Sequence, residues 1–245
     1  MKSLGVHRWG RGPQVVLVHG SVGGGESTWA EQRPLAERFA LIVVDRPGYG
    51  GTPMVEREDF EEDAPLVAEA LGDVRTSSAI RTVESSRSWR PPSGLRNVRS
   101  LTVVEPPAFG VARDHPAVRE LVDALARHWD AGERDPEAFL RRFLELVGSD
   151  MRPPSPLPPE LERGARVLLV ERPPWEAEIP VDALAAAPFP KLVVSGGASR
   201  GLRCGLRPAR RAPGGRTGSY PRRGPFRAAH GKALNERLER FLPAG

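Results

Sequence analysis

A buried strand that ends in a His-Gly turn is the feature of this sequence that most restricts its fold. Residues 14–18 are almost wholly apolar, and the run stops at His19-Gly20. A strand in a parallel sheet is covered on both faces, so it lacks the alternation of a half-exposed strand. A glycine-rich stretch follows, and glycine permits the tight turn that leads into a crossover helix. The run therefore predicts an inner strand of an α/β domain.

The same pattern recurs along the chain at the spacing of strand-helix-strand units. Three further apolar runs predict buried strands at 41–44, 101–104 and 191–194, and helical patterns occupy 27–38, 59–71, 116–130, 135–148 and 232–242. Such units connect by right-handed crossovers, which gives a mostly parallel, doubly wound sheet. We expect an α/β core formed by residues 1–109 and 188–245, interrupted by a helical insertion at 110–187.

Length and composition restrict the class further. A chain of 245 residues fits one α/β domain with an insertion. It has no apolar run of membrane-spanning length and no signal-peptide pattern, so we expect a cytoplasmic protein without a membrane partner. The single cysteine, Cys204, lies among arginines without a His/Asp pattern, which predicts neither a metal site nor a thiol nucleophile. No cofactor is expected, and nothing in the sequence indicates an oligomeric state.

The positive charge is confined to two blocks. Residues 74–99 hold six arginines against one acid, residues 199–230 hold nine arginines and no acid, and the whole chain carries +5. The rest of the chain is therefore acidic. Neither block has a strand-length apolar run or a helical period, so we expect irregular structure at 74–99 and at 198–231.

Two motifs at the ends of neighbouring strands carry a resemblance. The first is His19-Gly20-Ser21 with glycines 23–25 behind it, and the second is Asp45-Arg46-Pro47-Gly48-Tyr49-Gly50. In this order they resemble the lid-bearing serine esterases of the α/β-hydrolase family, and the likeness extends through residues 101–110, the insertion and the final helix. Asp45 and Arg46 are interpreted as a structural pair that holds the second turn.

The resemblance implies a fold and a site. The fold is the α/β-hydrolase fold, with residues 110–187 as a helical lid. The predicted oxyanion hole comprises His19, Gly20, Ser21 and Val22: the backbone N–H of Ser21 or Val22 would bind the charged oxygen, and His19 and Gly20 would shape the turn. The alternative is that the glycines only permit a tight turn.

The family's two reactive side chains are missing. The nucleophile elbow, Gly-x-Ser-x-Gly, belongs between Asp73 and Leu101, and the catalytic histidine belongs shortly before the final helix. The two arginine-rich blocks occupy these places. The resemblance therefore implies a serine hydrolase ancestry, and we expect the present chain to be inactive.

A shifted reading frame accounts for both blocks. Sequence rich in Arg, Ser, Pro and Gly without periodicity is typical of a GC-rich coding segment translated in the wrong frame. For residues 78–84, the third base of each codon joined to the next two bases permits Gly-His-Ser-Tyr-Gly-Gly, a nucleophile elbow. A shift through residues 223–226 permits Ala-Gly-His-Ser, where a catalytic histidine is due. We interpret the blocks as frame-shifted text.

Several residues are possible substitutes for the missing groups. Ser199 lies in a literal Gly-x-Ser-x-Gly, but no apolar helix follows it, and His230 is a displaced candidate for the base. Glu105 and Glu171 end strand-like runs, where α/β proteins often hold site residues. Either residue could be the acid of the site; the alternative for each is a structural or solvated role. The remaining histidines, His7, His115 and His128, are interpreted as surface or lid residues.

Three functions compete at this point. The first is a serine hydrolase of small apolar esters, favoured over an Asp-nucleophile dehalogenase or epoxide hydrolase because the restored elbow contains serine. The second is the same fold without activity. The third is a non-catalytic basic protein that binds nucleic acid or another polyanion through the arginine-rich segments. Those segments hold few aromatic residues for stacking (Trp89, Tyr220 and Phe226) and no helical face, which disfavours the third.

Overall fold

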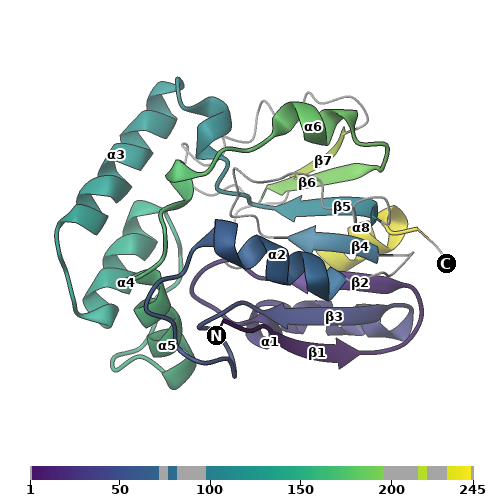
Figure 1. Ribbon diagram of the computed structural model, residues 1–245, viewed down its shortest axis with the longest axis horizontal. Helices are drawn as coiled ribbons and strands as arrows, with labels where there is room; N and C mark the ends of the chain where they lie inside the picture. The colour runs from purple at the N-terminus through teal and green to yellow at the C-terminus, as the bar shows by residue number, and fades with distance from the viewer. Residues whose placement is uncertain (1, 72–76, 82–97, 196–214, 220–230, 244–245) are drawn as a thin grey trace.

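A single twisted sheet organises the computed structural model, which describes residues 2–71, 77–81, 98–195, 215–219 and 231–243 (Figure 1). Its strand order is β1-β3-β2-β4-β5-β6-β7. The strands are β1 (Gly5–Trp9), β2 (Gln14–Val18), β3 (Ala40–Asp45), β4 (Ser77–Arg81), β5 (Val98–Val104), β6 (Lys191–Ser195) and β7 (Gly215–Ser219). Only β1 is antiparallel to its neighbour, so the carboxyl ends of the other six strands share one edge of the sheet.

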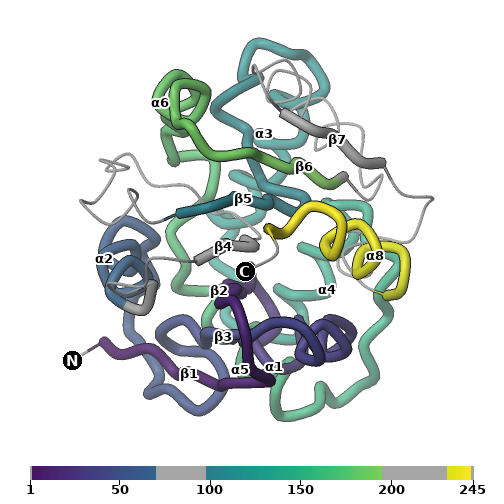
Figure 2. Tube along the Cα trace, turned by 90° about the vertical axis from the view of Figure 1, so that its right-hand side faces the viewer, coloured from purple at the N-terminus to yellow at the C-terminus, as the bar shows by residue number. Residues whose placement is uncertain are grey.

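Helices cover both faces of this sheet. On one face, α1 (Gly25–Thr28), the 3₁₀ helix η1 (Ala30–Glu37) and α8 (Lys232–Phe241) pack on β2, β3 and β6, and on the other α2 (Phe60–Leu71) packs on β2 and β3. Figure 2 shows α2 and α8 on opposite sides of the sheet. The arrangement is that of an α/β protein with helices in both outer layers.

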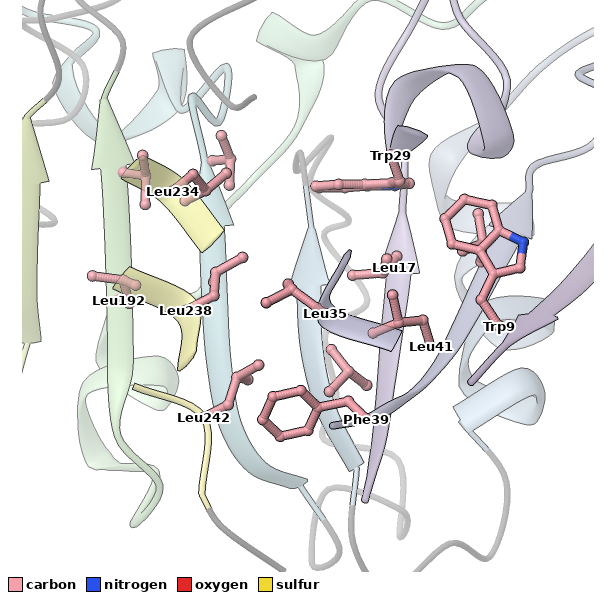
Figure 3. Close-up of a cluster of buried hydrophobic side chains, with 14 residues drawn as sticks. Trp9, Leu17, Trp29, Leu35, Phe39, Leu41, Leu192, Leu234, Leu238 and Leu242 are labelled. Carbon is pink, nitrogen blue, oxygen red and sulfur yellow. The ribbon is translucent and has the colours of Figure 1, made fainter. Parts of the chain in front are cut away.

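The core follows from the apolar runs of the strands. Val15, Leu17, Leu41 and Val43 contact the α1, η1 and α8 side, and their neighbours in sequence contact the α2 side, because successive side chains point to opposite faces. Figure 3 shows Trp29 of the α1–η1 junction and Leu234 and Leu238 of α8 against this face, and all three are at most 1% exposed.

A separate helical layer lies between β5 and β6 in sequence. It comprises η3 (Phe109–Ala112), α3 (Pro116–Asp130), α4 (Pro136–Leu146), α5 (Pro159–Leu168), η4 (Pro174–Glu176) and α6 (Val181–Ala186). Helices α3, α4 and α5 gather at the side towards which the parallel strands point (Figure 1). They form their own apolar clusters around Phe139 and Leu125. The layer therefore lies beside the carboxyl edge of the sheet.

Most predicted elements are confirmed, with three corrections. The expectation of irregular structure was wrong for 77–81 and 215–219, whose backbones pair as β4 and β7; backbone hydrogen bonds to β5 and β6 form whatever the side chains are. The helix predicted at 27–38 is mainly a 3₁₀ helix, because Pro34 has no N–H for an α-helical bond. The edge strand β1 was not predicted, because polar and apolar residues mix in its five positions.

Candidate active site at the carboxyl edge of the sheet

The topology places the switch point of the sheet between β2 and β4. From β2 the chain moves to β3 on one side, and it then returns to β4 on the other side of β2. In open α/β sheets, ligands bind outside the carboxyl ends of the strands at such a switch point. Val18, the last residue of β2, is in register with Arg81, the last residue of β4. The residues that follow β4 lie outside the described part of the chain, so the described site begins with the turn after β2.

We call residues 19–24 the His-Gly turn, and His19 fixes its start. The His19 ring is fully buried. Its Nε2 accepts a hydrogen bond of 3.0 Å from the backbone N–H of Arg46, and its Nδ1 lies 2.6 Å from the carbonyl oxygen of Gly20. Nε2 as acceptor requires the proton on Nδ1, which donates to Gly20. Both ring nitrogens of His19 are therefore engaged in hydrogen bonds to the backbone, which is the arrangement of a structural group.

Val22 gives the turn a strained backbone. Its φ is 80°, in the left-handed region that side chains branched at Cβ rarely enter. A non-glycine residue held there costs on the order of 1–3 kcal/mol. Val22 is nevertheless 1% exposed and packed among Phe139, Leu140 and Leu168 of α4 and α5. The helical layer thus contributes directly to the packing of the turn.

Asp45, at the end of β3, ties the turn to the sheet. Its Oδ1 accepts from the N–H of Gly25 at 2.6 Å, and its Oδ2 lies 2.8 Å from Nε2 of His7 on β1. Burial raises the pKa of this carboxyl, but the hydrogen bonds from His7 and Gly25 outweigh burial, and the net pKa is lowered. Gly50, with φ 53°, lies so close that a Cβ would overlap the carboxylate.

Arg46 is the centre of a buried charge cluster. Its Nη2 donates to Oε1 of Glu58 and, at 3.3 Å, to Oε1 of Glu171, which also accepts from Ser21 Oγ at 2.9 Å. The side chains of Arg46, Glu58 and Glu171 are at most 6% exposed. Charges taken this far from water require paired partners. Asp45 and Arg46 are both satisfied, as expected, but with separate partners instead of with each other.

Helix α5 holds the His-Gly turn from outside. Glu160 Oε1 accepts from the backbone N–H of Gly24 at 3.4 Å and from the hydroxyl of Ser27. Gly164 places the helix backbone against Val22, where a Cβ would overlap the Val22 carbonyl oxygen. Arg163 donates to the carbonyl oxygens of Gly48, at 2.8 Å, and Thr52 in the second turn. The same helix therefore contacts the turns that follow β2 and β3.

The structure brings Ser21 and Glu171 together, whereas Glu105 lies at the end of β5. Glu171 follows α5 and forms a single parallel bridge with Glu58. The interpretation of the run that ends at Glu171 as strand-like was therefore wrong, because most of that run is helix and its buried residues follow helical spacing. Glu105 follows β5 with φ 45°, and its N–H donates to Val194 at 2.8 Å. Ser199, His230, Cys204 and the frame-shift positions 82–84 and 223–226 lie outside the described residues.

The three other histidines are placed as follows. His7 is one-third exposed on β1 and bonded to Asp45. His115 accepts from the N–H of Ala117 at 3.2 Å and caps α3. His128 is buried in α3, where its ring stacks on Phe139 with centroids 4.1 Å apart. Glu58 and Glu160 were not predicted as site residues, because their only signal in the sequence is a carboxylate near a helix start.

Neither a metal site nor a membrane helix is found in the described ranges. No group of three or more His, Cys, Asp or Glu side chains among these residues is arranged to hold a metal ion. None of the helices in the same ranges combines the length and the apolar character needed to cross a bilayer.

Comparison with solved structures defines the class. An α/β hydrolase from Sphaerobacter thermophilus superposes with a TM-score of 0.59 and 25% identity, over 98% of this chain and 96% of that chain. The sheet order, the motifs after β2 and β3 and this likeness agree, and the chain belongs to the α/β-hydrolase family. No protein-family model matches the chain.

Its sequence relatives within the family are esterases. A pimeloyl-[acyl-carrier protein] methyl ester esterase of Methylococcus capsulatus is 34% identical over 172 residues, covering 68% of this chain and 64% of the relative. The esterase of the same name from Chromobacterium violaceum is 43% identical over 154 residues, covering 59% of this chain and 57% of the relative. The chain thus matches less than two thirds of the length of these curated relatives.

Proposed function

We propose that this chain carries the scaffold of a serine esterase that cleaves carboxylic esters. The observation behind the proposal is the position of the His-Gly turn, at the carboxyl end of β2 and beside the switch point with β4. In the proposed role, the backbone N–H of Ser21 or Val22 binds the oxygen that becomes negative as the ester carbonyl is attacked. His19 and Gly20 shape the turn, and α3 to α5 act as the lid.

The reaction needs a nucleophile and a base that the written sequence does not supply. In a serine esterase, the hydroxyl oxygen attacks the carbonyl carbon, and histidine takes the proton and returns it to the leaving alkoxide. Water then cleaves the acyl-enzyme by the same steps. The buried acids assigned above, Glu58 and Glu171, are held by Arg46, which favours a structural role for Glu171. We therefore propose that the present chain is inactive.

The relatives' names support a substrate class. Both are named for the methyl ester of an acyl group on a carrier protein. We propose a small alkyl ester of an apolar acyl chain as the ancestral substrate, because the wall that α4 and α5 present to the turn is formed by Phe139, Leu140 and Leu168. An apolar wall favours an acyl chain over a charged group.

Two proteins test the proposal: the chain as written, and the chain with the text around 78–84 and 223–226 replaced by that of the shifted frame. We expect no turnover of p-nitrophenyl acetate by the first, and turnover by the second that a serine-directed phosphonate abolishes. Phosphonate-sensitive turnover by the first would contradict the inactivity. An inactive but folded second protein would contradict the esterase scaffold.

The gene sequence tests the origin of the two blocks. We expect compensating insertions and deletions around each block when the gene is set beside those of relatives. A clean reading frame, encoding both blocks in relatives as well, would contradict the frame-shift proposal and leave the esterase scaffold to be judged by the turnover assay.

A further inference from the structure

The His-Gly turn is packed mainly by α4 and α5. The side chain of Val22 belongs to the apolar cluster of α4 and α5, and none of the other three clusters formed by the described residues contains it. Its φ of 80° is unfavourable for a valine. A residue remains in such a conformation only where its surroundings over-determine it. Among the described residues, the helical layer supplies the apolar side chains that surround Val22.

Helix α5 and the segment that follows it contact three residues of the turn. The backbone of Gly164 lies against the carbonyl oxygen of Val22, with no room for a Cβ between them. Glu171, three residues beyond the end of α5, accepts from Ser21 Oγ at 2.9 Å. Glu160, in the first turn of α5, accepts from the N–H of Gly24 at 3.4 Å.

Among the described residues, hydrogen bonds from the sheet side reach the start of the turn and the residue that follows it. His19 is bonded to the backbone N–H of Arg46, and Gly25 is bonded to Asp45. In the middle part between these points, Ser21, Val22 and Gly24 contact α5 or the segment behind it, and Gly24 also lies beside Asp45. The strained residue lies within this middle part.

We propose that α5 positions the His-Gly turn: Gly164, Glu160 and Glu171 are positioning residues that keep Val22 left-handed, and the turn relaxes when α5 moves away. The consequence for chemistry rests on the proposed function. The amide donors for the ester oxygen are aligned when α5 is docked and lose their alignment when it is not, so closure over an acyl chain and oxyanion binding are coupled. The conformation of Val22 depends on these contacts whether or not the chain hydrolyses an ester.

Gly164→Ala tests the coupling. Alanine strengthens an isolated helix relative to glycine, so loosening of the turn in this variant cannot come from a weaker α5. We expect the ¹³Cα and ¹³Cβ chemical shifts of Val22 to leave left-handed values. We also expect the Gly24 amide to exchange about tenfold faster, with β3 amides unchanged within about twofold. The matched control is Gly51→Ala, where a Cβ would meet open space, and it leaves both readouts unchanged.

A second pair of variants covers the case in which Gly164→Ala does not fold. Ser21→Ala removes the hydroxyl bonded to Glu171, and Ser21→Thr retains it. We expect about fivefold faster exchange at Gly24 in the alanine variant and recovery towards wild type in the threonine variant. Two results would overturn the proposal. One is faster amide exchange in α5 with unchanged chemical shifts of Val22, and the other is an equal rise of amide exchange in the turn and in β3. Neither readout uses hydrolysis, so an inactive protein does not affect the result.

Discussion

The backbone N–H of Arg46 donates to Nε2 of His19 over 3.0 Å, so a buried imidazole joins the ends of two neighbouring parallel strands. The ring also packs edge-on against Tyr49, with centroids 4.7 Å apart. A histidine at this place in a hydrolase-like motif could be taken for a catalytic residue. Both ring nitrogens are instead engaged in hydrogen bonds to the backbone, and the histidine holds the turns after β2 and β3 in register.

Replacement of His19 tests this structural role. His19→Phe keeps a ring beside Tyr49 but leaves the buried N–H of Arg46 without an acceptor, and we expect a loss of about 1–3 kcal/mol in the free energy of unfolding. His19→Gln places an amide near the same N–H and should lose less. Urea denaturation measures both, and a phenylalanine variant as stable as wild type would rule the role out.

Arg46→Met removes the cation from a buried cluster of two glutamates. The carboxylates of Glu58 and Glu171 then remain in the interior without their shared guanidinium, and we expect destabilisation of about 3–5 kcal/mol. Arg57→Met is the control, because the Arg57 side chain is 66% exposed in its pair with Asp59 and is expected to contribute at most about 1 kcal/mol. Chemical denaturation of the two variants measures both losses in the free energy of unfolding. Equal losses would show that the burial of Arg46 adds nothing to the effect of removing a positive charge, and would contradict the prediction.

Gly50→Ala should disturb the turn after β3. Gly50 has φ 53°, and an added Cβ would overlap the carboxylate of Asp45, which is itself fixed by Gly25 and His7. We expect a loss of about 2 kcal/mol or more. Gly51→Ala, one residue further on, meets open space and should change stability by about 0.5 kcal/mol or less. Thermal unfolding measures the stability of both variants. Similar midpoints would contradict the prediction that the close approach of Gly50 to the Asp45 carboxylate leaves no room for a side chain.

His128 gives the helical layer a sensitivity to acid. Burial is the main cause that lowers the pKa of this imidazole below its ordinary value of 6.5. The unfolded chain therefore binds a proton at a higher pH than the folded chain, and stability falls as the pH drops below about 6.5. His128→Gln should show a smaller loss between pH 7 and pH 5, measured by urea midpoints at each pH. An unchanged slope in the variant would contradict the assignment.

The apolar runs and the two motifs were sufficient to predict the main strands, the helical insertion and the place of the His-Gly turn. These features are local: a run of valines and leucines between glycine-rich turns is buried in a parallel sheet wherever it lies. The backbone pairing of β4 could not be predicted, because Ser77–Arg81 lacks an apolar run, and the hydrogen bonds of a sheet join main-chain groups that every sequence has.

What the sequence by itself determined is the order of elements, the position of the two turns and the absence of a Gly-x-Ser-x-Gly between Asp73 and Leu101. Only the tertiary structure decided the partners of the charged groups. Glu171 meets Ser21 across 150 positions of the chain, and Gly164 meets Val22 because α5 packs on the carboxyl edge of the sheet. No local pattern encodes such a pair, since its energy depends on burial and on distances that exist only after the layers have assembled.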